Sequence, residues 1–163
     1  MAVTMWMDEI NHVRINGRFS DFEDSASDIA EKLVRTQGIP NNWNENNVAS
    51  IGLADEPRVL NMGKISMFVD LMNESKPSSN PKCAGDSNYN CSKSLLGVGK
   101  YEFYITIENL DGTNISINNT PVKAGRYPVD ETDKLTITRP SIVNNTIVQM
   151  KLTLWYTEKG ETG

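Results

Sequence analysis

Histidine and cysteine, which often stand at the centre of a catalytic or metal site, are rare in this chain, whereas Asp and Glu are plentiful. His12 is the only histidine, and it lies in a helical pattern far along the sequence from either cysteine. A zinc site or a Ser-His-Asp triad would need this side chain at the centre of a cluster, so we interpret it as a packing or solvent-exposed histidine. The sequence contains no nucleotide-binding, zinc-protease, serine-hydrolase or calcium-loop motif. We therefore predict that the protein is not an enzyme and uses no metal and no cofactor.

The two cysteines, Cys83 and Cys91, carry a clearer chemical signal. They flank a segment of turn-forming residues, and two thiols eight positions apart in such a segment can reach disulfide geometry. The bond would remove roughly 2–3 kcal/mol worth of unfolded-chain freedom. The alternative is a pair of free thiols in a reducing compartment, where an exposed loop would leave them reactive. We predict the disulfide, which favours a location outside the cytoplasm.

Acceptor sequences for N-glycosylation are frequent in this chain. The pattern Asn-X-Ser/Thr begins at five positions, all in segments with the composition of surface structure. These positions are Asn73, Asn90, Asn114, Asn118 and Asn144. Some of them arise by chance in a sequence so rich in Asn, Ser and Thr. Together they agree with the disulfide in predicting an exported glycoprotein.

The composition excludes two classes of protein. The chain has 163 residues, with 16 basic and 21 acidic side chains and a formal charge of −5, so it lacks the basic face of a nucleic-acid-binding protein. No apolar run approaches the roughly 18 residues that a membrane-spanning helix needs. The length predicts a single domain, in which a helix at 1–36 belongs with a globular head at 37–163.

The first 36 residues predict one long helix, because apolar residues recur there at three- and four-residue steps. The stripe begins with Val3, Trp6, Met7, Ile10 and Val13 and continues with Phe19, Phe22, Ala26, Ile29, Ala30 and Leu33. Gly38 and Pro40 end the helix. At 1.5 Å per residue it would be about 50 Å long, more than a domain of this size needs for itself. We therefore expect something outside this chain to pack on part of it.

The remaining sequence predicts a second helix and several strands. Asn61 can cap a helix at 61–75, residues 76–92 have the composition of a surface loop, and 93–99 form a short helical turn. Strands are expected at 48–53, 101–109, 113–118, 134–139 and 147–156. Asp111-Gly112 is the hairpin signal that would pair 113–118 with the strand before it. The expected fold is α+β, a long N-terminal helix packed on an antiparallel sheet of about four strands.

Several stretches resemble the soluble part of archaeal type IV pilin-like proteins, of the group that carries a class III signal peptide. LVRTQGIPNNW at 33–43 and SIGLADEPRVLNMGKI at 50–65 are similar to the helix exit of that group, an LxxTxGxPxxW run followed by IGLA and LNxxKI segments. LLGVGKYEFYITIENLDG at 95–112 looks like its first central strand, and TRPSIVNNTIVQMKLTLWY at 138–156 looks like its last hairpin. The pilin signature itself, a cleavage site followed by some twenty apolar residues, is missing. We expect the chain to be truncated at that point.

The resemblance implies a pilin or minor pilin, a structural subunit of an archaeal type IV pilus-like filament on the cell surface, with a role in adhesion. Its partners would be other pilin subunits, identical or different, and it would meet the membrane only through the missing N-terminal segment. The expected subunit interface is the exposed start of the helix stripe, Val3, Trp6, Met7 and Ile10. The alternative is that these residues belong to the core of the domain itself.

Two other functions stay open. One is an extracellular module that binds a soluble ligand such as a carbohydrate, with Trp43, Tyr89, Tyr101 and Tyr104 as candidate stacking residues. The other is an enzyme that acts through two carboxylates within about 10 Å of each other in a cleft, which no sequence pattern singles out.

Overall fold

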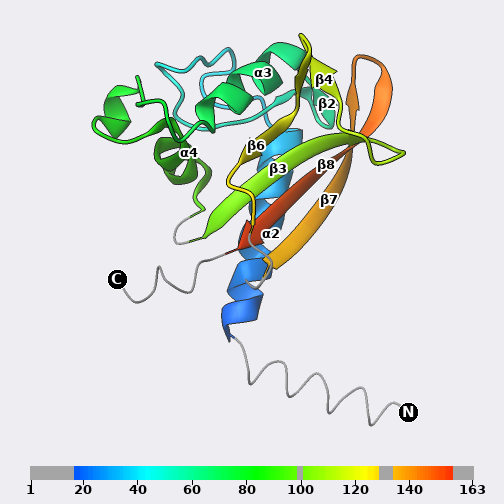
Figure 1. The fold of residues 1–163 in the computed structure, drawn as a ribbon, viewed down its shortest axis with the longest axis horizontal. Coiled ribbons are helices and arrows are strands. Elements are labelled where there is room, and N and C mark those ends of the chain that lie inside the picture. Colours follow the sequence, from blue (N-terminus) through cyan, green and yellow to red (C-terminus); the bar gives the residue numbers. More distant parts are fainter. Residues whose placement is uncertain (1–16, 99–100, 129–133, 156–163) are drawn as a thin grey trace.

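The centre of the molecule is a curled, mixed sheet of six strands in the order β1-β2-β7-β8-β3-β6 (Figure 1). The computed structural model describes residues 17–98, 101–128 and 134–155. The three central strands of the sheet are β3 (Glu102–Asn109), β7 (Lys134–Val143) and β8 (Thr146–Trp155). β8 pairs antiparallel with each of the other two. Their alternating sequences place one apolar face against the core, where Ile105 pairs with Leu152 and both are at most 1% exposed.

Short strands complete the sheet at both edges. β1 (Ala54–Glu56) and β2 (Val59–Leu60) form a tight hairpin, and β2 runs parallel to β7. β6 (Lys123–Gly125) pairs with β3 at the other edge. A separate small hairpin of β4 (Ser116–Ile117) and β5 (Thr120–Pro121) stands beside α3.

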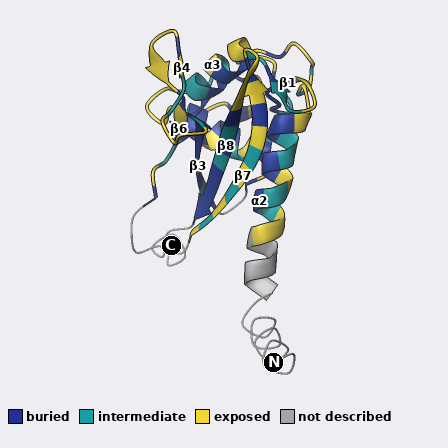
Figure 2. Ribbon diagram, turned by 90° about the vertical axis from the view of Figure 1, so that its right-hand side faces the viewer, coloured by how far each residue is buried: buried dark blue, intermediate teal, exposed yellow. Residues whose placement is uncertain are grey.

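Helix α2 (Gly17–Arg35) lies across the apolar face of the sheet. Its buried stripe, which includes Ala26, Ile29 and Leu33, faces the strands, while exposed residues lie on its outer side (Figure 2). Arg139 on β7 binds Glu31 and donates from Nη2 to Ser27 Oγ at 3.2 Å. Burial alone would raise the pKa of Glu31, but the Arg139 and Arg35 guanidinium groups outweigh it and lower that pKa. The helix is therefore held on the sheet by apolar packing and by the Arg139–Glu31 ion pair.

A smaller layer of helices covers one end of the sheet. It consists of α3 (Met62–Leu71), a 3₁₀ turn at Pro81–Cys83 and α4 (Asn88–Leu96). Asn61 caps α3 by accepting from the Lys64 N–H at 2.9 Å, as the sequence predicts. No helix within residues 17–98, 101–128 and 134–155 has the length and hydropathy to cross a bilayer.

The predicted fold class is wrong. Within the described residues the structure has three short helices and a six-stranded mixed sheet, mostly β, instead of a long N-terminal helix on about four antiparallel strands. The described helix has 19 residues, and the part of the expected helix before Gly17 lies outside the described residues. Strands β1, β2 and β6 were missed because two or three residues are too few to show alternation.

Three local expectations also differ from the structure. Residues 48–53 are no strand, because their backbone groups bond to the end of α2 and to Ile39 instead of to a sheet. Residues 113–118 make only brief ladder contacts with β3 and then turn into β4. The expected loop 76–92 is an ordered segment that buries Tyr89 and Cys91, since Ser87 caps a helix that starts within it.

Candidate functional site

The predicted disulfide joins Cys83 to Cys91, and both cysteines are buried. Side-chain amides fix the segment around the bond. Asn80 donates to the Val48 carbonyl at 2.9 Å and Asn88 donates to the Asp70 carbonyl at 3.2 Å. Because both asparagines are buried with their amides bonded to backbone carbonyls, the segment is a packed part of the head.

A network of charged and polar side chains joins α4 to strand β3 of the sheet. The Tyr89 hydroxyl donates to Glu102 Oε1 at 2.7 Å and accepts from the Phe103 N–H at 3.1 Å. Lys93 Nζ and Arg126 Nη1 lie 3.2 and 3.3 Å from the same carboxylate oxygen. Burial, followed by the Glu102 carboxylate, raises the pKa of Tyr89, so this phenol stays protonated. Arg126 also pairs with Glu74, so two carboxylates meet two cations and the network holds α4 against the sheet.

The segments that resemble the pilin helix exit meet at the C-terminal end of α2. The end of a helix leaves carbonyl groups without partners, and here the following chain supplies them. The Leu53, Ala54 and Arg58 N–H groups donate to the carbonyls of Leu33, Thr36 and Val34 at 3.0, 3.0 and 2.7 Å. This set of bonds, which we call the exit lock, fixes the end of α2 to the head.

Two side chains close the exit lock. Trp43 is buried and donates from Nε1 to the Gly52 carbonyl at 2.9 Å. Gly52 has no room for a side chain, because a Cβ there would lie 2.4 Å from the Thr36 carbonyl oxygen. Lys64 of α3 is also buried, and its Nζ donates to the carbonyls of Gln37 and Ala54 at 2.8 and 3.3 Å. Burial lowers the pKa of Lys64, although the nearby Asp55 opposes that shift.

The five acceptor asparagines occupy different environments. Asn73, Asn90, Asn118 and Asn144 are exposed, whereas Asn114 is half-buried. Asn118 and Asn144 share one geometry: each is the first residue of an Asn-Asn turn between two antiparallel strands, with φ of 53° and 52°. Positive φ at both turn residues matches the twist of the strands, and Asn tolerates it well. The repeated Asn-Asn-Thr sequence was a hairpin signal that the sequence interpretation did not use.

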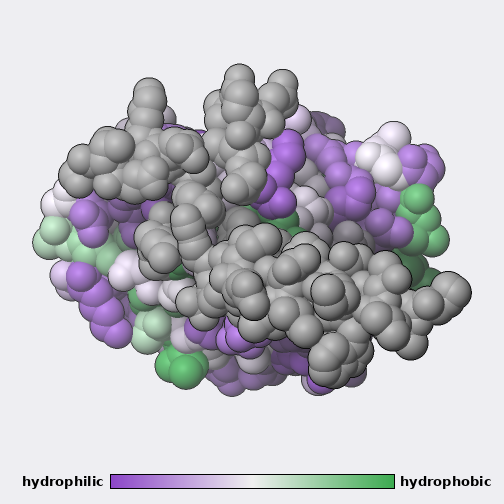
Figure 3. Space-filling view, turned by 90° about the horizontal axis from the view of Figure 1, so that it is seen from below, coloured by the Kyte–Doolittle hydropathy of each residue, from purple (hydrophilic) through white to green (hydrophobic). Residues whose placement is uncertain are grey.

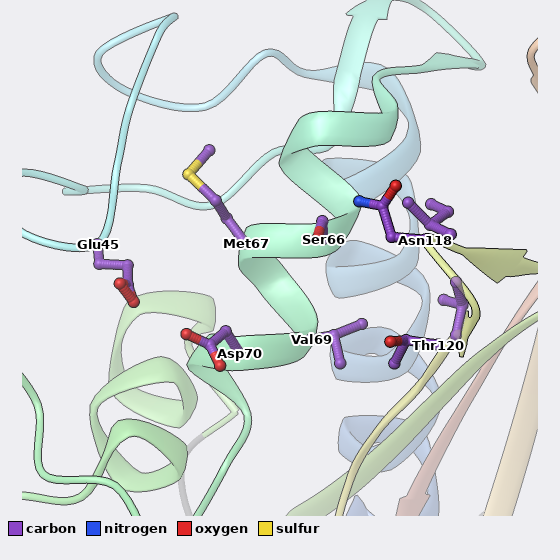
Figure 4. Close-up of a pocket in the computed structure, with 9 residues that line it drawn as sticks. Glu45, Ser66, Met67, Val69, Asp70, Asn118 and Thr120 are labelled. Carbon is purple, nitrogen blue, oxygen red and sulfur yellow. The ribbon is translucent and has the colours of Figure 1, made fainter.

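A pocket of about 310 Å³ lies between α3 and the β4–β5 hairpin. Figure 4 shows Ser66 and Val69 of α3 on the side of Asn118 and Thr120, whereas Met67 and Asp70 extend from the other side of the helix. Ile117, Val122 and Glu45 complete the lining. The walls therefore combine apolar surface with hydroxyl, amide and carboxylate groups. Nothing in the sequence predicts this pocket, because it depends on the placement of two short strands.

The face of the sheet opposite α2 carries an aromatic pair. Tyr127 is 71% exposed and packs edge-on against Tyr104, with ring centroids 5.1 Å apart. Thr106, Thr136, Thr153 and Lys151 lie on the same face as Tyr104. Of the predicted stacking residues, Trp43, Tyr89 and Tyr101 are at most 5% exposed and form part of the core. Tyr104 alone among those four is placed to contact a ligand.

The described part of the face seen in Figure 3 offers no broad apolar surface. Figure 3 shows mainly hydrophilic residues, with hydrophobic ones in small separate patches on the described part of that face. The exposed large hydrophobic side chains of the described chain are Ile39, Met62, Leu110, Tyr127, Ile142 and Ile147. The expected subunit interface, Val3, Trp6, Met7 and Ile10, lies outside the described residues, as does His12. No cluster of His, Cys, Asp and Glu suited to a metal ion occurs among residues 17–98, 101–128 and 134–155.

Comparisons with known proteins add no relative: no family model, no curated protein and no solved structure matches the chain.

Proposed function

We propose that this chain is the head of a pilin or minor pilin, a structural subunit of an archaeal type IV pilus-like surface filament that takes part in adhesion. The observation that carries the proposal is the way α2 is held. The helix lies on the sheet, and its N-terminal turns run past the ends of β7 and β8 (Figure 1). A subunit that hangs from a helical stalk needs a helix with one anchored end and one end clear of the head.

The exit lock supports the same proposal mechanically. In a filament, tension enters each head through its helix, so the joint between helix and head must resist being pulled apart. Backbone bonds to Leu33, Val34 and Thr36 and the buried Lys64 ammonium lie at that joint. The Arg139–Glu31 ion pair adds a contact from the sheet one turn earlier on the helix. The stretches that resemble the pilin helix exit thus have a physical task here.

Disulfide chemistry and the acceptor sequences support an extracellular location. The Cys83–Cys91 bond persists where the surroundings are oxidising. Asn73, Asn118 and Asn144 are exposed, and the Ser or Thr of each acceptor sequence is exposed too. Both features suit a head that faces the medium.

The reading frame upstream of Val3 gives the first test. We expect it to encode a short basic segment, a cleavage site and about twenty apolar residues that run into the helix. An ordinary secretion signal in that place would remove the anchor of the filament and overturn the proposal.

The second test is incorporation into filaments sheared from the cells that make the protein. We expect antibodies against the head to label purified filaments, and we expect Trp6→Glu with Ile10→Glu to abolish that label, because charge on the apolar stripe prevents helix packing. Asp8→Asn in the same segment is the matched control and should leave incorporation unchanged. Filaments without the wild-type protein would contradict the proposal.

A second candidate, an extracellular carbohydrate-binding module, is favoured by one observation. Tyr127 presents an exposed aromatic ring that packs on the half-buried Tyr104, on the sheet face opposite α2. Aromatic rings pack on the CH faces of sugars while hydroxyl and amide groups bond to their hydroxyls. A sugar bound there by the isolated head, with no label in filaments, would favour this candidate over the pilin.

A further inference from the structure

The pocket between α3 and the β4–β5 hairpin combines the two kinds of surface that a sugar needs. Val69, Val122 and, on the other side of α3, Met67 supply apolar area for the CH groups of successive pyranose rings. Ser66, Thr120 and Asp70 supply hydroxyl and carboxylate groups for its hydroxyls. At about 310 Å³ the cavity is at the small end of ligand sites, which span about 300–1,000 Å³.

The acceptor asparagine Asn118 is part of the pocket wall. It is exposed, and no hydrogen bond from another described residue holds its side chain. Figure 4 shows its amide extending toward Ser66 on α3, across the pocket. Thr120, the hydroxyl residue of the same acceptor sequence, also lines the pocket. A group attached to the Asn118 amide nitrogen would therefore start at the pocket and face into it.

Asn144 shows that this arrangement is not a general property of the turn. It has the same Asn-Asn-Thr sequence, the same kind of hairpin and nearly the same φ, 52° against 53°. Yet it stands at the β7–β8 turn and lines no part of this pocket. The chain thus contains two acceptor sites with matched local structure, of which Asn118 lines this pocket and Asn144 does not.

We propose that the pocket seats an N-linked glycan carried by Asn118 of the same chain, with the first sugar lying against Ser66 and Val69 and the following sugars extending over α3 to Met67. The proposal rests on the extracellular location in the proposed function, since attachment needs export. A separate transferase makes the bond from a sugar activated at its anomeric carbon as a polyprenyl phosphate. The Asn118 Nδ2–carbon bond forms as the carbon–oxygen bond to phosphate breaks. The phosphate leaves with the electron pair, and the amide proton goes to a base.

Methionine oxidation can report whether the pocket is filled. Met67 lines the pocket, whereas Met62 of the same helix is 40% exposed and lies outside the pocket, so it serves as an internal reference. The protein is purified from the cells that make it, treated with hydrogen peroxide and analysed by peptide mass spectrometry, which also gives glycan occupancy. In the glycosylated protein we expect Met67 to oxidise about threefold or more slowly than in Asn118→Gln, with Met62 unchanged.

Three further variants separate the glycan from the turn. Asn144→Gln makes the same change in the same turn geometry and should leave Met67 protected. Thr120→Ala keeps Asn118 in place but destroys the acceptor sequence, so it should expose Met67 as Asn118→Gln does. Thr120→Ser retains the acceptor hydroxyl and should retain the protection.

Two results would overturn the proposal: a mature protein whose Asn118 carries no glycan, or an occupied Asn118 with Met67 oxidised as fast as in Asn118→Gln. The proposed pilin function is tested by a separate measurement, the labelling of filaments, so the two proposals can fail independently. A protein present in filaments with Asn118 bare contradicts the glycan seat alone. A protein absent from filaments with Met67 protected contradicts the filament proposal alone.

Discussion

Arg126, directly after β6, forms a two-point ion pair with Glu74, which follows α3. Its Nε and Nη2 lie 3.1 and 3.0 Å from the two carboxylate oxygens of Glu74. The same guanidinium contacts Glu102 on β3 and lies 5.1 Å from the centre of the Tyr89 ring on α4. Since these partners come from three other segments, Arg126 is the point where the helical layer is fastened to the edge of the sheet.

Replacing Arg126 with Met should therefore destabilise the protein by about 1–3 kcal/mol, because Glu102, with only 13% of its side chain exposed, loses one of its cations. Urea unfolding followed by tryptophan fluorescence measures the change. Lys76→Met is the comparison, since it removes the ion pair between Lys76 and Asp70. The side chains of these two residues are 50% and 42% exposed. Pairs so exposed contribute less than about 1 kcal/mol. Equal losses in the two variants would contradict the role given to Arg126.

Stability should fall in acid because two carboxylates are held ionised by arginines. The hydrogen bond and charge of Arg126 lower the pKa of Glu74, and Arg139 with Arg35 lowers that of Glu31 against the opposing effect of burial. A lowered pKa stabilises the folded state above the unfolded value, about 4.3 for Glu. That contribution is lost as the pH falls through the lowered pKa.

The midpoint of urea unfolding, measured from pH 7 down to pH 3, should therefore drop below about pH 4.5. Glu31→Gln removes one of the two groups, so its midpoint should depend less on pH across this range than that of the wild type. An identical pH profile for Glu31→Gln would show that the Arg139 contact has no electrostatic effect on folding.

The disulfide should stabilise the head by about 2–3 kcal/mol, the value expected for closing a short loop in the unfolded chain. Cys83→Ser with Cys91→Ser should lower the free energy of unfolding by that amount. In this variant the loss of protection from hydrogen exchange should be local. Exchange should increase in α4 while β3 and β8 stay protected. Because Cys91 is buried on α4, uniform exchange across the sheet would mean that the segment around the bond is part of the main folding unit.

The long central strands could be predicted from sequence, and the edges of the sheet could not. Alternation over 101–109 and 147–156 is a local property, and β3 and β8 occupy nearly those residues. β2 pairs in parallel with β7 through residues about eighty positions apart in the chain, which no local pattern reveals. Residues 48–53 have the composition of a strand, but the Ala49 and Ser50 N–H groups donate to the Ile39 carbonyl and the Leu53 N–H group donates to the Leu33 carbonyl at the end of α2.

Among the candidate sites too, those that depend on residues close in sequence were predictable, and those that depend on distant segments were not. The disulfide was predictable from two cysteines near each other in sequence. The pocket was not, because its walls come from α3 and from strands of two residues each. Three of four aromatic residues chosen as ligand contacts are buried, since an apolar ring in a polar sequence most often serves the core. Tyr127, the most exposed aromatic residue described, was not among them.

Gly52→Ala should damage the exit lock. The added methyl would meet the Thr36 carbonyl oxygen at 2.4 Å and the Gly38 nitrogen at 2.5 Å, and both of those atoms belong to backbone that cannot easily move. We expect a loss of about 1–3 kcal/mol by overpacking, measured by thermal and urea unfolding. Gly63→Ala is the comparison, since its methyl would lie 3.1 Å from the Asn61 side chain at the start of a helix, where Ala is favoured. If Gly52→Ala were the milder change, the close approach would not be structurally required.

Tyr127→Ala tests whether the sheet face opposite α2 binds sugars through its exposed aromatic residue. With 71% of its surface exposed, Tyr127 adds little to folding, so unfolding should shift by no more than about 0.5 kcal/mol. Any glycan that binds through the Tyr104–Tyr127 pair should bind about tenfold more weakly to this variant, a loss of about 1.4 kcal/mol, measured on a glycan array and then by calorimetry. Leu110→Ala, at 64% exposure, removes another exposed hydrophobic side chain and should leave binding unchanged. A wild-type head that binds no glycan would remove the carbohydrate-binding candidate and leave α2 and its exit lock as the features that bear on function.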